Sequence, residues 1–285
     1  MIGVGLIGGS CAMAWRKAGC VERIVGIGRG RANLERALEL GVIDEIAADT
    51  ASGVSGADVV LIAVPVGQLA GVLRDAVPAL DRDVVITDGG STKQDVVTAA
   101  RTGLGKHLPR FVPAHPIAGA ERSGVDAARA DLYVGRNVVL TPLPETDAEA
   151  TEKVRSLWSA CGARVTDLSP QEHDAVFAAV SHLPHALAFA LVDMIARRDN
   201  ASQLFGYAAG GFRDFTRIAS SSPEMWRDIC LANRAAILGE IDAFGERLGA
   251  LREAVADADG ARIERIFGNA RSARDAWLKS IEDAK

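Results

Sequence analysis

The first eight residues contain the glycine pattern that most constrains how this chain can fold. Gly3, Gly5 and Gly8 match G-x-G-x-x-G, the turn between a strand and a helix that holds the pyrophosphate of a dinucleotide. The first glycine permits the tight turn, the second lets backbone N–H groups approach the phosphates, and the third lets the helix pack closely on its strand. The pattern alone also occurs in ordinary glycine turns, so the assignment as a dinucleotide-binding turn depends on the rest of the chain.

The strand that should precede Gly3 has only two residues, Met1 and Ile2. A first strand normally has about five or six residues. We therefore expect the native protein to have a few more apolar residues before Met1.

Short apolar segments alternate with helical segments as far as residue 168. The run from Asp58 to Val64 is almost continuously apolar, as in a strand that is buried on both faces of a parallel sheet. This alternation predicts an α/β fold with a doubly wound parallel sheet of the Rossmann type. The expected strands are 24–27, 58–64, 83–87, 110–113, 137–141 and 164–167, and the expected helices are 10–18, 33–40, 94–100 and 147–161.

From Ser169 onward, helical periodicity replaces the alternation. Residues 170–198 carry apolar side chains at helical spacing, with a kink expected at Pro184, and residues 223–248 and 261–281 are expected to form further long helices. We therefore divide the chain into a Rossmann domain, 1–168, and an all-helical C-terminal domain, 169–285. Helices with apolar residues on several faces often bury them against a second copy, which predicts a homodimer.

The composition indicates a cytoplasmic globular protein. A net charge of −5 without a block of Lys or Arg gives no support for nucleic-acid binding. There is no apolar run of about 18 residues or more and no signal peptide, so a membrane span is not expected. The four cysteines are scattered without C-x-x-C, which favours free thiols in a reducing compartment.

The loop after the second expected strand bears on the choice of cofactor. Dinucleotide folds often place an Asp or Glu there, which binds the ribose 2′-hydroxyl of NAD. This chain has Gly28-Arg29-Gly30-Arg31 instead. Two guanidinium groups can bind a 2′-phosphate, and no carboxylate repels it. We therefore favour NADP over NAD, although solvated loop charges would have the same sequence.

Polar clusters fall at the ends of expected strands, which is where open parallel sheets bind their ligands. One cluster is Gly90-Ser91-Thr92-Lys93, and another extends from His115 to Glu121. A histidine that directly follows a short strand and precedes a proline is held rigidly in the cleft. Because a neutral imidazole can accept a proton near pH 7, His115 is the candidate base.

The helical half contributes further histidines and two arginines. His182 and His185 are three residues apart and share a helix face, but without H-E-x-x-H or a partnering cysteine they do not predict a metal site. Arg213 and Arg217 are four residues apart. One such guanidinium can clamp the carboxylate of an anionic substrate through two parallel N–H bonds.

Six motifs occur in the same order as in one known family. They are Gly-Leu-Ile-Gly-Gly-Ser (5–10), Asp-Gly-Gly-Ser-Thr-Lys (88–93), His-Pro-Ile-Ala-Gly-Ala-Glu-Arg-Ser-Gly (115–124), Ser-His-Leu-Pro-His (181–185), Gly-Phe-Arg-Asp-Phe-Thr-Arg-Ile-Ala (211–219) and Met-Trp-Arg-Asp-Ile (225–229) followed by Asn233. Over residues 1 to about 245 the chain resembles the prephenate/arogenate (cyclohexadienyl) dehydrogenase family of tyrosine biosynthesis. The resemblance implies a Rossmann domain, a helical dimerisation domain and an active site between them. It also implies oxidative decarboxylation of prephenate or arogenate to 4-hydroxyphenylpyruvate or tyrosine, with hydride transfer to NAD(P).

The resemblance further implies roles for single residues. His115 would help to remove the proton of the substrate hydroxyl, Ser91 would hold that hydroxyl or position His115, and Arg217 would bind the ring carboxylate. Glu121 would lie near the cleft and regulate access to it. The other expected substrate contacts are His173, His182, His185 and Arg213, and the expected cofactor contacts are Gly3, Gly5, Leu6, Ile7, Gly8, Arg29, Arg31, Val64 and Pro65.

Two other functions stay open at this point. A related β-hydroxyacid dehydrogenase would use a helix-borne lysine, and lysine is nearly absent from the helical half. A non-catalytic NADP-binding regulatory protein would bind the nucleotide without turning over prephenate or arogenate. The choice between prephenate and arogenate also stays open, because both carry the hydroxyl and the ring carboxylate that the named residues address.

Overall fold

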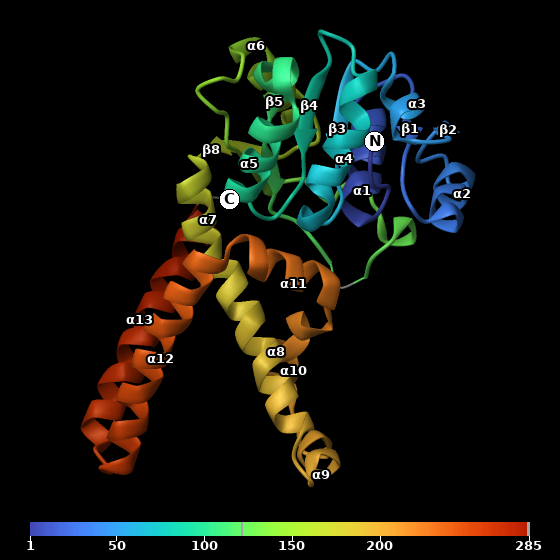
Figure 1. Ribbon diagram of the computed structural model, residues 1–285. Helices are drawn as coiled ribbons and strands as arrows, with labels where there is room; N and C mark the ends of the chain where they lie inside the picture. The colour runs from blue at the N-terminus through green and yellow to red at the C-terminus, as the bar shows by residue number, and fades with distance from the viewer. Residues whose placement is uncertain (121, 284–285) are drawn as a thin grey trace. The chain divides into compact units, whose positions relative to one another are not determined.

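The computed structural model describes residues 1–120 and 122–283. The chain forms two compact units, residues 1–236 and 237–285. The first unit contains the strands and the helices up to α11, and the second contains most of α12 (Arg234–Ala256) and all of α13 (Gly260–Asp283) (Figure 1).

The described strands form three short sheets that are largely parallel. They are β1 (Val25–Gly26), β2 (Glu45–Ile46), β3 (Val59–Ile62), β4 (Val85–Asp88), β5 (Phe111–Val112), β6 (Ala114–Pro116), β7 (Asn137–Leu140) and β8 (Arg164–Asp167). The sheets have the orders β1-β2, β3-β4-β5 and β6-β7-β8. This confirms the expected α/β class, with one difference, since β6 pairs antiparallel with β7.

Residues 1–3 take the place of the first strand. Ile2 forms parallel bridges with both Ile27 and Ile62, so it joins the sheet of β1 to the sheet of β3. Its N–H donates to the carbonyl oxygen of Leu61 over 2.8 Å. The side chain of Ile2 is 2% exposed, which places this short segment in the core.

Helices cover both faces of the central sheet. They are α1 (Leu6–Lys17), α2 (Arg31–Glu39), α3 (Thr50–Val54), α4 (Leu69–Ala76), α5 (Gln94–Gly103) and α6 (Ala148–Ala160), with 3₁₀ turns η1 (Val66–Gln68), η2 (Val77–Ala79), η3 (Gly105–Arg110) and η4 (Val125–Ala127). Alternate residues of β3 point to opposite faces. Val60 and Ile62 pack in a cluster with α4 and α5, whereas Leu61 packs in a cluster with Trp15 of α1 and Trp158 of α6.

The helical part of the first unit begins with an interrupted helix. It comprises α7 (Pro170–Phe177), the π-helical turn η5 (Ala178–His182) and α8 (Leu183–Ala196), followed by α9 (Ala201–Gly206), α10 (Gly210–Thr216), the 3₁₀ turn η6 (Arg217–Ser220) and α11 (Pro223–Ala232). The distortion therefore lies just before Pro184, the residue at which a kink is expected. Pro184 has no N–H and its ring crowds the carbonyl of Val180, so the regular bonding pattern cannot continue there.

The single helix expected over residues 223–248 is wrong. α11 ends at Ala232 and α12 begins at Arg234. Asn233 between them has φ −102° and ψ 33°, and its side-chain amide donates to the carbonyl oxygen of Asp174 over 2.7 Å. Helical periodicity of the apolar residues does not reveal this break, because Asn233 is held by polar contacts to residues far away in the sequence.

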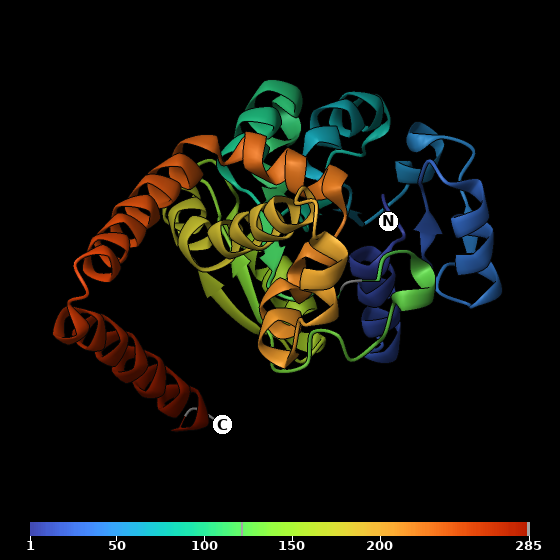
Figure 2. The same ribbon diagram turned by 90° about the horizontal axis from the view of Figure 1, so that it is seen from below.

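In the second unit, α12 and α13 form a helical hairpin. Ala258 at the turn has φ 54°, and the two arms diverge from the turn in Figure 2. Large apolar side chains are exposed along both arms, namely Leu238, Ile241, Phe244, Leu248, Val255, Phe267, Trp277 and Ile281.

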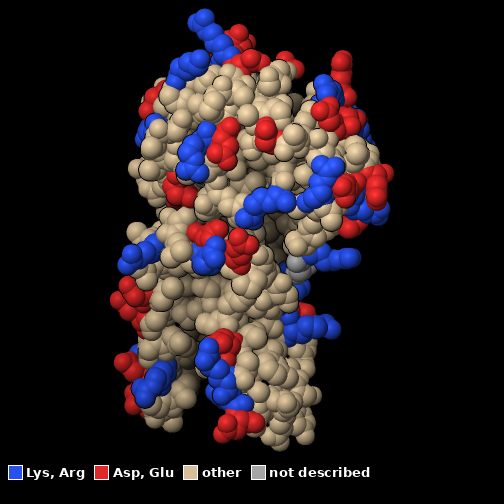
Figure 3. All heavy atoms as spheres, turned by 45° about the vertical axis from the view of Figure 1, so that its right-hand side comes forward, with Lys and Arg blue, Asp and Glu red and all other residues tan. Residues whose placement is uncertain are grey.

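The segment Pro170–Ala196 is long and apolar enough, by length and composition, to cross a membrane, although the core helix of a soluble protein meets the same criteria. It contains a π-helical turn and buries three polar residues, His173, Asp174 and His182. On the face shown in Figure 3, Lys and Arg side chains are interspersed with Asp and Glu.

Candidate active site

The glycine turn leaves space for a phosphate at the start of α1. Gly3 has φ +92°, and a Cβ added there would overlap the carbonyl oxygen of Ala63, while a Cβ on Gly8 would overlap the carbonyl oxygen of Gly3. A Cβ on Gly5, the N-cap residue, would meet no atom within 4 Å. The first turn of α1 has neither a side-chain cap nor an acidic residue, so its N–H groups and dipole are suited to an anion. These residues therefore fit the pyrophosphate of a dinucleotide.

Two further groups of expected cofactor contacts lie beside this turn. Val64 follows β3, and its Cγ1 is 3.1 Å from the position of a Cβ on Gly3. Gly3 donates its N–H to the carbonyl oxygen of Ile27, which precedes the loop that carries Arg29 and Arg31. Both arginines are exposed, and the Nε of Arg31 lies 2.8 Å from Oε1 of Glu35.

Asp88, at the end of β4, holds together two segments that carry candidate catalytic residues. Its Oδ2 accepts hydrogen bonds from the Gly90 N–H (2.8 Å) and from Nζ of Lys93 (2.5 Å). Its Oδ1 accepts the N–H of Ala114 over 3.0 Å. Gly90 directly precedes Ser91, and Ala114 directly precedes His115. One buried carboxylate therefore holds the backbone next to both candidate catalytic residues.

His115 lies inside a strand and not, as expected, in a loop after one. β5 ends before Pro113, which has no N–H to continue a sheet. The chain then pairs with β7, where His115 is opposite Val139. This position lies close to the glycine turn, because a Cβ on Gly89 would be 3.4 Å from Ile7 and 3.7 Å from Pro116.

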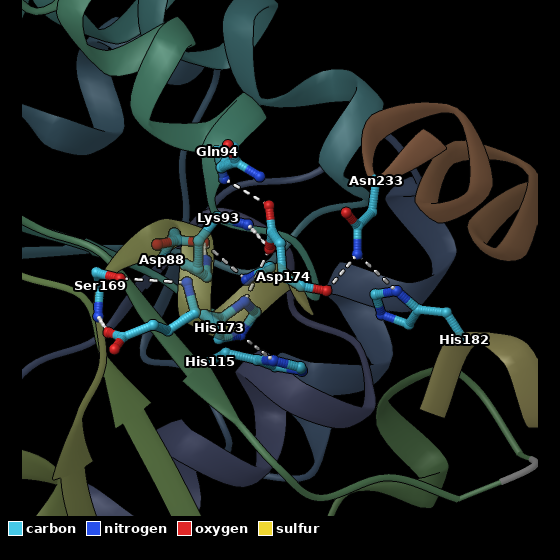
Figure 4. A network of polar contacts seen from close by, with 11 residues as sticks. Asp88, Lys93, Gln94, His115, Ser169, His173, Asp174, His182 and Asn233 are labelled. Atoms are coloured by element: carbon cyan, nitrogen blue, oxygen red, sulfur yellow. Dashed lines mark hydrogen bonds and ion pairs between the residues drawn. The ribbon is translucent and has the colours of Figure 1, made fainter. Parts of the chain in front are cut away.

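The ring of His115 is the first member of a chain of three side chains (Figure 4). Its Nδ1 lies 2.8 Å from Nε2 of His173, and Nδ1 of His173 lies 2.8 Å from Oδ1 of Asp174. The ring of Phe177 packs against both histidines, with centroid distances of 5.0 Å and 4.5 Å. His173 and Asp174 are fully buried.

The hydrogen-bond partners assign the protons of this chain. An ionised carboxylate only accepts, so Nδ1 of His173 carries the proton and its Nε2 is an acceptor. Nδ1 of His115 must then donate to His173. The remaining ring nitrogen of His115, Nε2, is left with a lone pair that can accept a proton.

Burial sets the protonation states. It lowers the pKa of His115 well below its usual value, and the neighbouring His173, Lys93 and His182 side chains lower it further. Burial also lowers the pKa of His173. Burial alone would raise the pKa of Asp174, but hydrogen bonds from His173 and from the backbone N–H groups of Gln94 and Lys93 outweigh it and lower that pKa. Both histidines are therefore neutral near pH 7, and Asp174 is ionised.

His182 is fixed by Asn233. The side-chain amide of Asn233 donates both to the carbonyl oxygen of Asp174 and to Nδ1 of His182, the latter over 3.1 Å. Nε2 of His182 therefore carries the proton, and the backbone of Ser91 lies close enough to this ring to raise its pKa in part. Burial lowers the pKa of His182 to about 4.

His185 lies one turn further along α8. Its ring stacks on Trp226 of α11, with centroids 3.7 Å apart and planes at 20°. Its Nδ1 donates to the carbonyl oxygen of Ser181 over 2.9 Å, which leaves Nε2 as an acceptor.

The expected carboxylate-binding residues lie on α10 and η6. Arg217 begins η6, which packs against α8, and its side chain is exposed. Arg213 on α10 is exposed and pairs with Asp214 over 3.4 Å. Glu121 lies outside the described residues. Within residues 1–120 and 122–283, no three His, Cys, Asp or Glu side chains are grouped to hold a metal ion.

Two family models match consecutive parts of the chain. The nucleotide-binding domain of prephenate dehydrogenase matches residues 11–167, and the prephenate dehydrogenase dimerization domain matches residues 169–269. The chain belongs to the prephenate dehydrogenase family.

Members of the prephenate dehydrogenase family resemble the chain over nearly its whole length. Prephenate dehydrogenase of Bacillus subtilis is 42% identical over 96% of this chain and 74% of its own length. Cyclohexadienyl dehydrogenase of Zymomonas mobilis is 38% identical over 100% of this chain and 97% of its own. The structure of prephenate dehydrogenase from Aquifex aeolicus with hydroxyphenyl propionate and NAD+ superposes with a TM-score of 0.90, at 36% identity and 96% coverage of both chains.

The prephenate dehydrogenase family models and this NAD+ complex support a pyridine nucleotide as the cofactor. Sequence reasoning missed four polar residues of the site, namely Asp88, Lys93, Asp174 and Asn233. Three of them occur in the motifs that carry the family resemblance, and Asp174 directly follows a candidate histidine. Their roles depend on contacts between distant segments, for which a single sequence has no signal.

Proposed function

We propose that this chain oxidises and decarboxylates prephenate, arogenate or both, with a pyridine nucleotide as the hydride acceptor. The observation that carries this proposal is the neutral His115, whose Nε2 lone pair remains available one residue before Pro116, which lies near Gly89 together with Ile7 of α1. A base for the substrate hydroxyl and a cradle for the dinucleotide are the two groups that the oxidation needs.

The chemistry can be followed at single atoms. When bound, the nicotinamide takes the hydride from the ring carbon that bears the hydroxyl. His115 Nε2 takes the hydroxyl proton as that carbon becomes a carbonyl. Loss of the ring carboxylate as CO2 leaves its bonding electrons in the ring, which becomes a phenolate. His115 can then return the proton to the phenolate oxygen, so the base is regenerated.

We assign the other roles to the residues that the resemblance names. Ser91 binds the hydroxyl or positions His115, and its support is the common anchoring of both segments by Asp88. Arg217 binds the ring carboxylate. His182 and His185 contact the substrate from the helical side, and the hydrogen bond of His185 Nδ1 to Ser181 leaves its Nε2 available as an acceptor.

A steady-state assay with all four pairings of prephenate or arogenate with NAD or NADP tests the function. The same assay of His115→Asn should show kcat lowered by about 100-fold or more, the usual range for a general base, with little change in KM. Unchanged kcat would contradict the role of His115. Nucleotide binding without turnover of either substrate would support a non-catalytic regulatory protein instead.

We further propose that NADP is the preferred cofactor. Its support is the pair of exposed arginines, Arg29 and Arg31, after β1. The carboxylate of Glu35 lies next to Arg31 and offsets part of its charge, so Arg29 is the stronger candidate for a 2′-phosphate contact.

We also propose a cytoplasmic homodimer that binds neither membranes nor nucleic acid. The four free cysteines fit a reducing compartment. The exposed apolar side chains of α12 and α13 need cover, and the family's dimerization domain includes α12 and the first turns of α13. Light scattering on the purified protein should give twice the chain mass, and a monomer at micromolar concentration would contradict this.

A further inference from the structure

We propose that His173 and Asp174 are positioning residues, which hold His115 with its Nε2 lone pair directed to the substrate hydroxyl and support the charge that this ring acquires. The proposal rests on the proposed function, because it takes His115 as the base. It replaces a substrate contact of His173 with a contact to the base itself.

Both ring nitrogens of His173 are already engaged. Nδ1 faces Asp174 and Nε2 faces Nδ1 of His115, each at 2.8 Å. The ring is fully buried and lies against Phe177. No polar atom of His173 is therefore left for a substrate, whereas the contact with His115 determines which nitrogen of the base carries a proton.

Asp174 is held independently of the histidines. Its Oδ1 also accepts the N–H of Lys93 over 2.8 Å, and its Oδ2 accepts the N–H of Gln94 over 2.9 Å. These are N–H groups at the start of α5, a helix of ten residues that has no side-chain cap of its own. The helix end and the two N–H groups favour the ionised carboxylate. Asp174 is thus a fixed acceptor, and the direction of both hydrogen bonds in the chain follows from it.

The same carboxylate compensates the charge change of the reaction. When Nε2 of His115 takes the hydroxyl proton, the ring becomes an imidazolium that still donates from Nδ1 to His173. His173 in turn donates to Asp174, so a negative charge lies two hydrogen bonds away. Among the residues that the structure describes, the other charged or titratable groups that act on the His115 ring are Lys93, paired with Asp88, and His182, which stays neutral near pH 7.

Asp174→Asn should remove the negative charge but keep the direction of the hydrogen bonds. An asparagine whose oxygen takes the place of Oδ1 still accepts from the N–H of Lys93 and from Nδ1 of His173. The imidazolium that His115 forms then has no negative charge two hydrogen bonds away. We expect kcat to fall by about 10-fold or more with KM changed less than about threefold.

The tautomer can be observed directly. With histidines labelled at the ring nitrogens, 15N NMR at pH 7 distinguishes protonated from unprotonated Nδ1 and Nε2, and His115→Asn assigns the signals. In the wild type, His115 should be protonated at Nδ1. In His173→Leu, which removes the acceptor of that proton, a substantial share of His115 should be protonated at Nε2.

Two variants distinguish a loss of His115 positioning from a loss of protein stability. His173→Leu removes both contacts but leaves Asp174 at the start of α5, and it should lower kcat by about 100-fold with an unchanged thermal midpoint. Asp95→Asn removes a carboxylate from the same first turn of α5 but leaves the three side chains His115, His173 and Asp174 in place. Its kcat should stay within about twofold of wild type.

The outcomes distinguish this inference from the function on which it rests. Wild-type kcat in His173→Leu, or a His115 that is protonated at Nδ1 alone both in His173→Leu and in wild type, would overturn the positioning role while leaving the enzyme assignment intact. Wild-type kcat in His115→Asn would instead overturn the base.

Discussion

Nζ of Lys93 lies 2.5 Å from Oδ2 of Asp88, and both side chains are at most 1% exposed. Lys93→Met would leave the carboxylate of Asp88 buried without its counter-charge. Breaking a buried ion pair in this way costs about 3–5 kcal/mol of unfolding free energy, measurable by urea denaturation. Lys153→Met is the matched control, since Lys153 is exposed, and it should change stability by less than about 0.5 kcal/mol. Equal losses in both variants would contradict a structural role for the pair.

Arg217→Ala should mainly raise KM for the substrate. A guanidinium that clamps the ring carboxylate contributes charge-assisted hydrogen bonds, so its loss should raise KM by about 10-fold or more and lower kcat much less. Arg197→Ala is the control and should change KM by less than about threefold, because Arg197 pairs with Asp193 at the surface. The same KM in Arg217→Ala and wild type would show that the carboxylate is bound elsewhere.

Arg29→Ala should discriminate between the two nucleotides. Loss of a contact to the 2′-phosphate should raise KM for NADP by about 10-fold and leave KM for NAD unchanged. Arg36→Ala on α2 is a suitable control, because Arg36 pairs with Asp126 over 2.9 Å. A parallel rise for both nucleotides in Arg29→Ala would argue against a 2′-phosphate site.

Alanine substitutions at two glycines of the turn should affect different properties, folding at Gly8 and nucleotide binding at Gly5. Gly8→Ala should lower the thermal midpoint or prevent folding, because its Cβ would overlap a backbone oxygen. Gly5 has φ −98°, which alanine can adopt, and space around it is open. Gly5→Ala should therefore fold normally and bind the nucleotide about 10-fold more weakly, as a calorimetric titration would show. Normal nucleotide affinity in Gly5→Ala would place the phosphates elsewhere.

Stability should fall as the solution becomes acidic. The pKa of His182 is about 4 in the folded protein against 6.5 ordinarily, so between these values the unfolded chain binds more protons than the folded one. From pH 7 to pH 5 this one ring should cost about 2 kcal/mol of unfolding free energy. Burial of His115 and His173 acts in the same direction.

Urea denaturation at the two pH values measures this loss. His182→Gln has no imidazole to protonate at that position, and it should show a smaller difference between pH 7 and pH 5. A wild-type protein that is equally stable at both pH values would contradict the prediction.

The sequence predicts the fold class well because its signals are local. Alternating apolar runs reveal β3 and β4, and the glycine turn identifies the start of α1. The break at Asn233 and the strand that contains His115 are different, since each depends on a partner far along the chain. In the site, the family resemblance implies a substrate contact for His173, whereas the structure surrounds that ring with Asp174 and His115. Neighbours in space, not in sequence, decide such roles.

Asp88 also has a consequence for how the site moves. Its carboxylate binds the N–H groups of Gly90 and Ala114, the residues immediately before Ser91 and His115. When the end of β4 fluctuates, both segments are carried along by the same anchor. The separation between Ser91 and His115 should therefore vary less in time than the distance of either from the helices of the second half. Motions of the sheet then shift the pair as a unit and preserve its internal spacing.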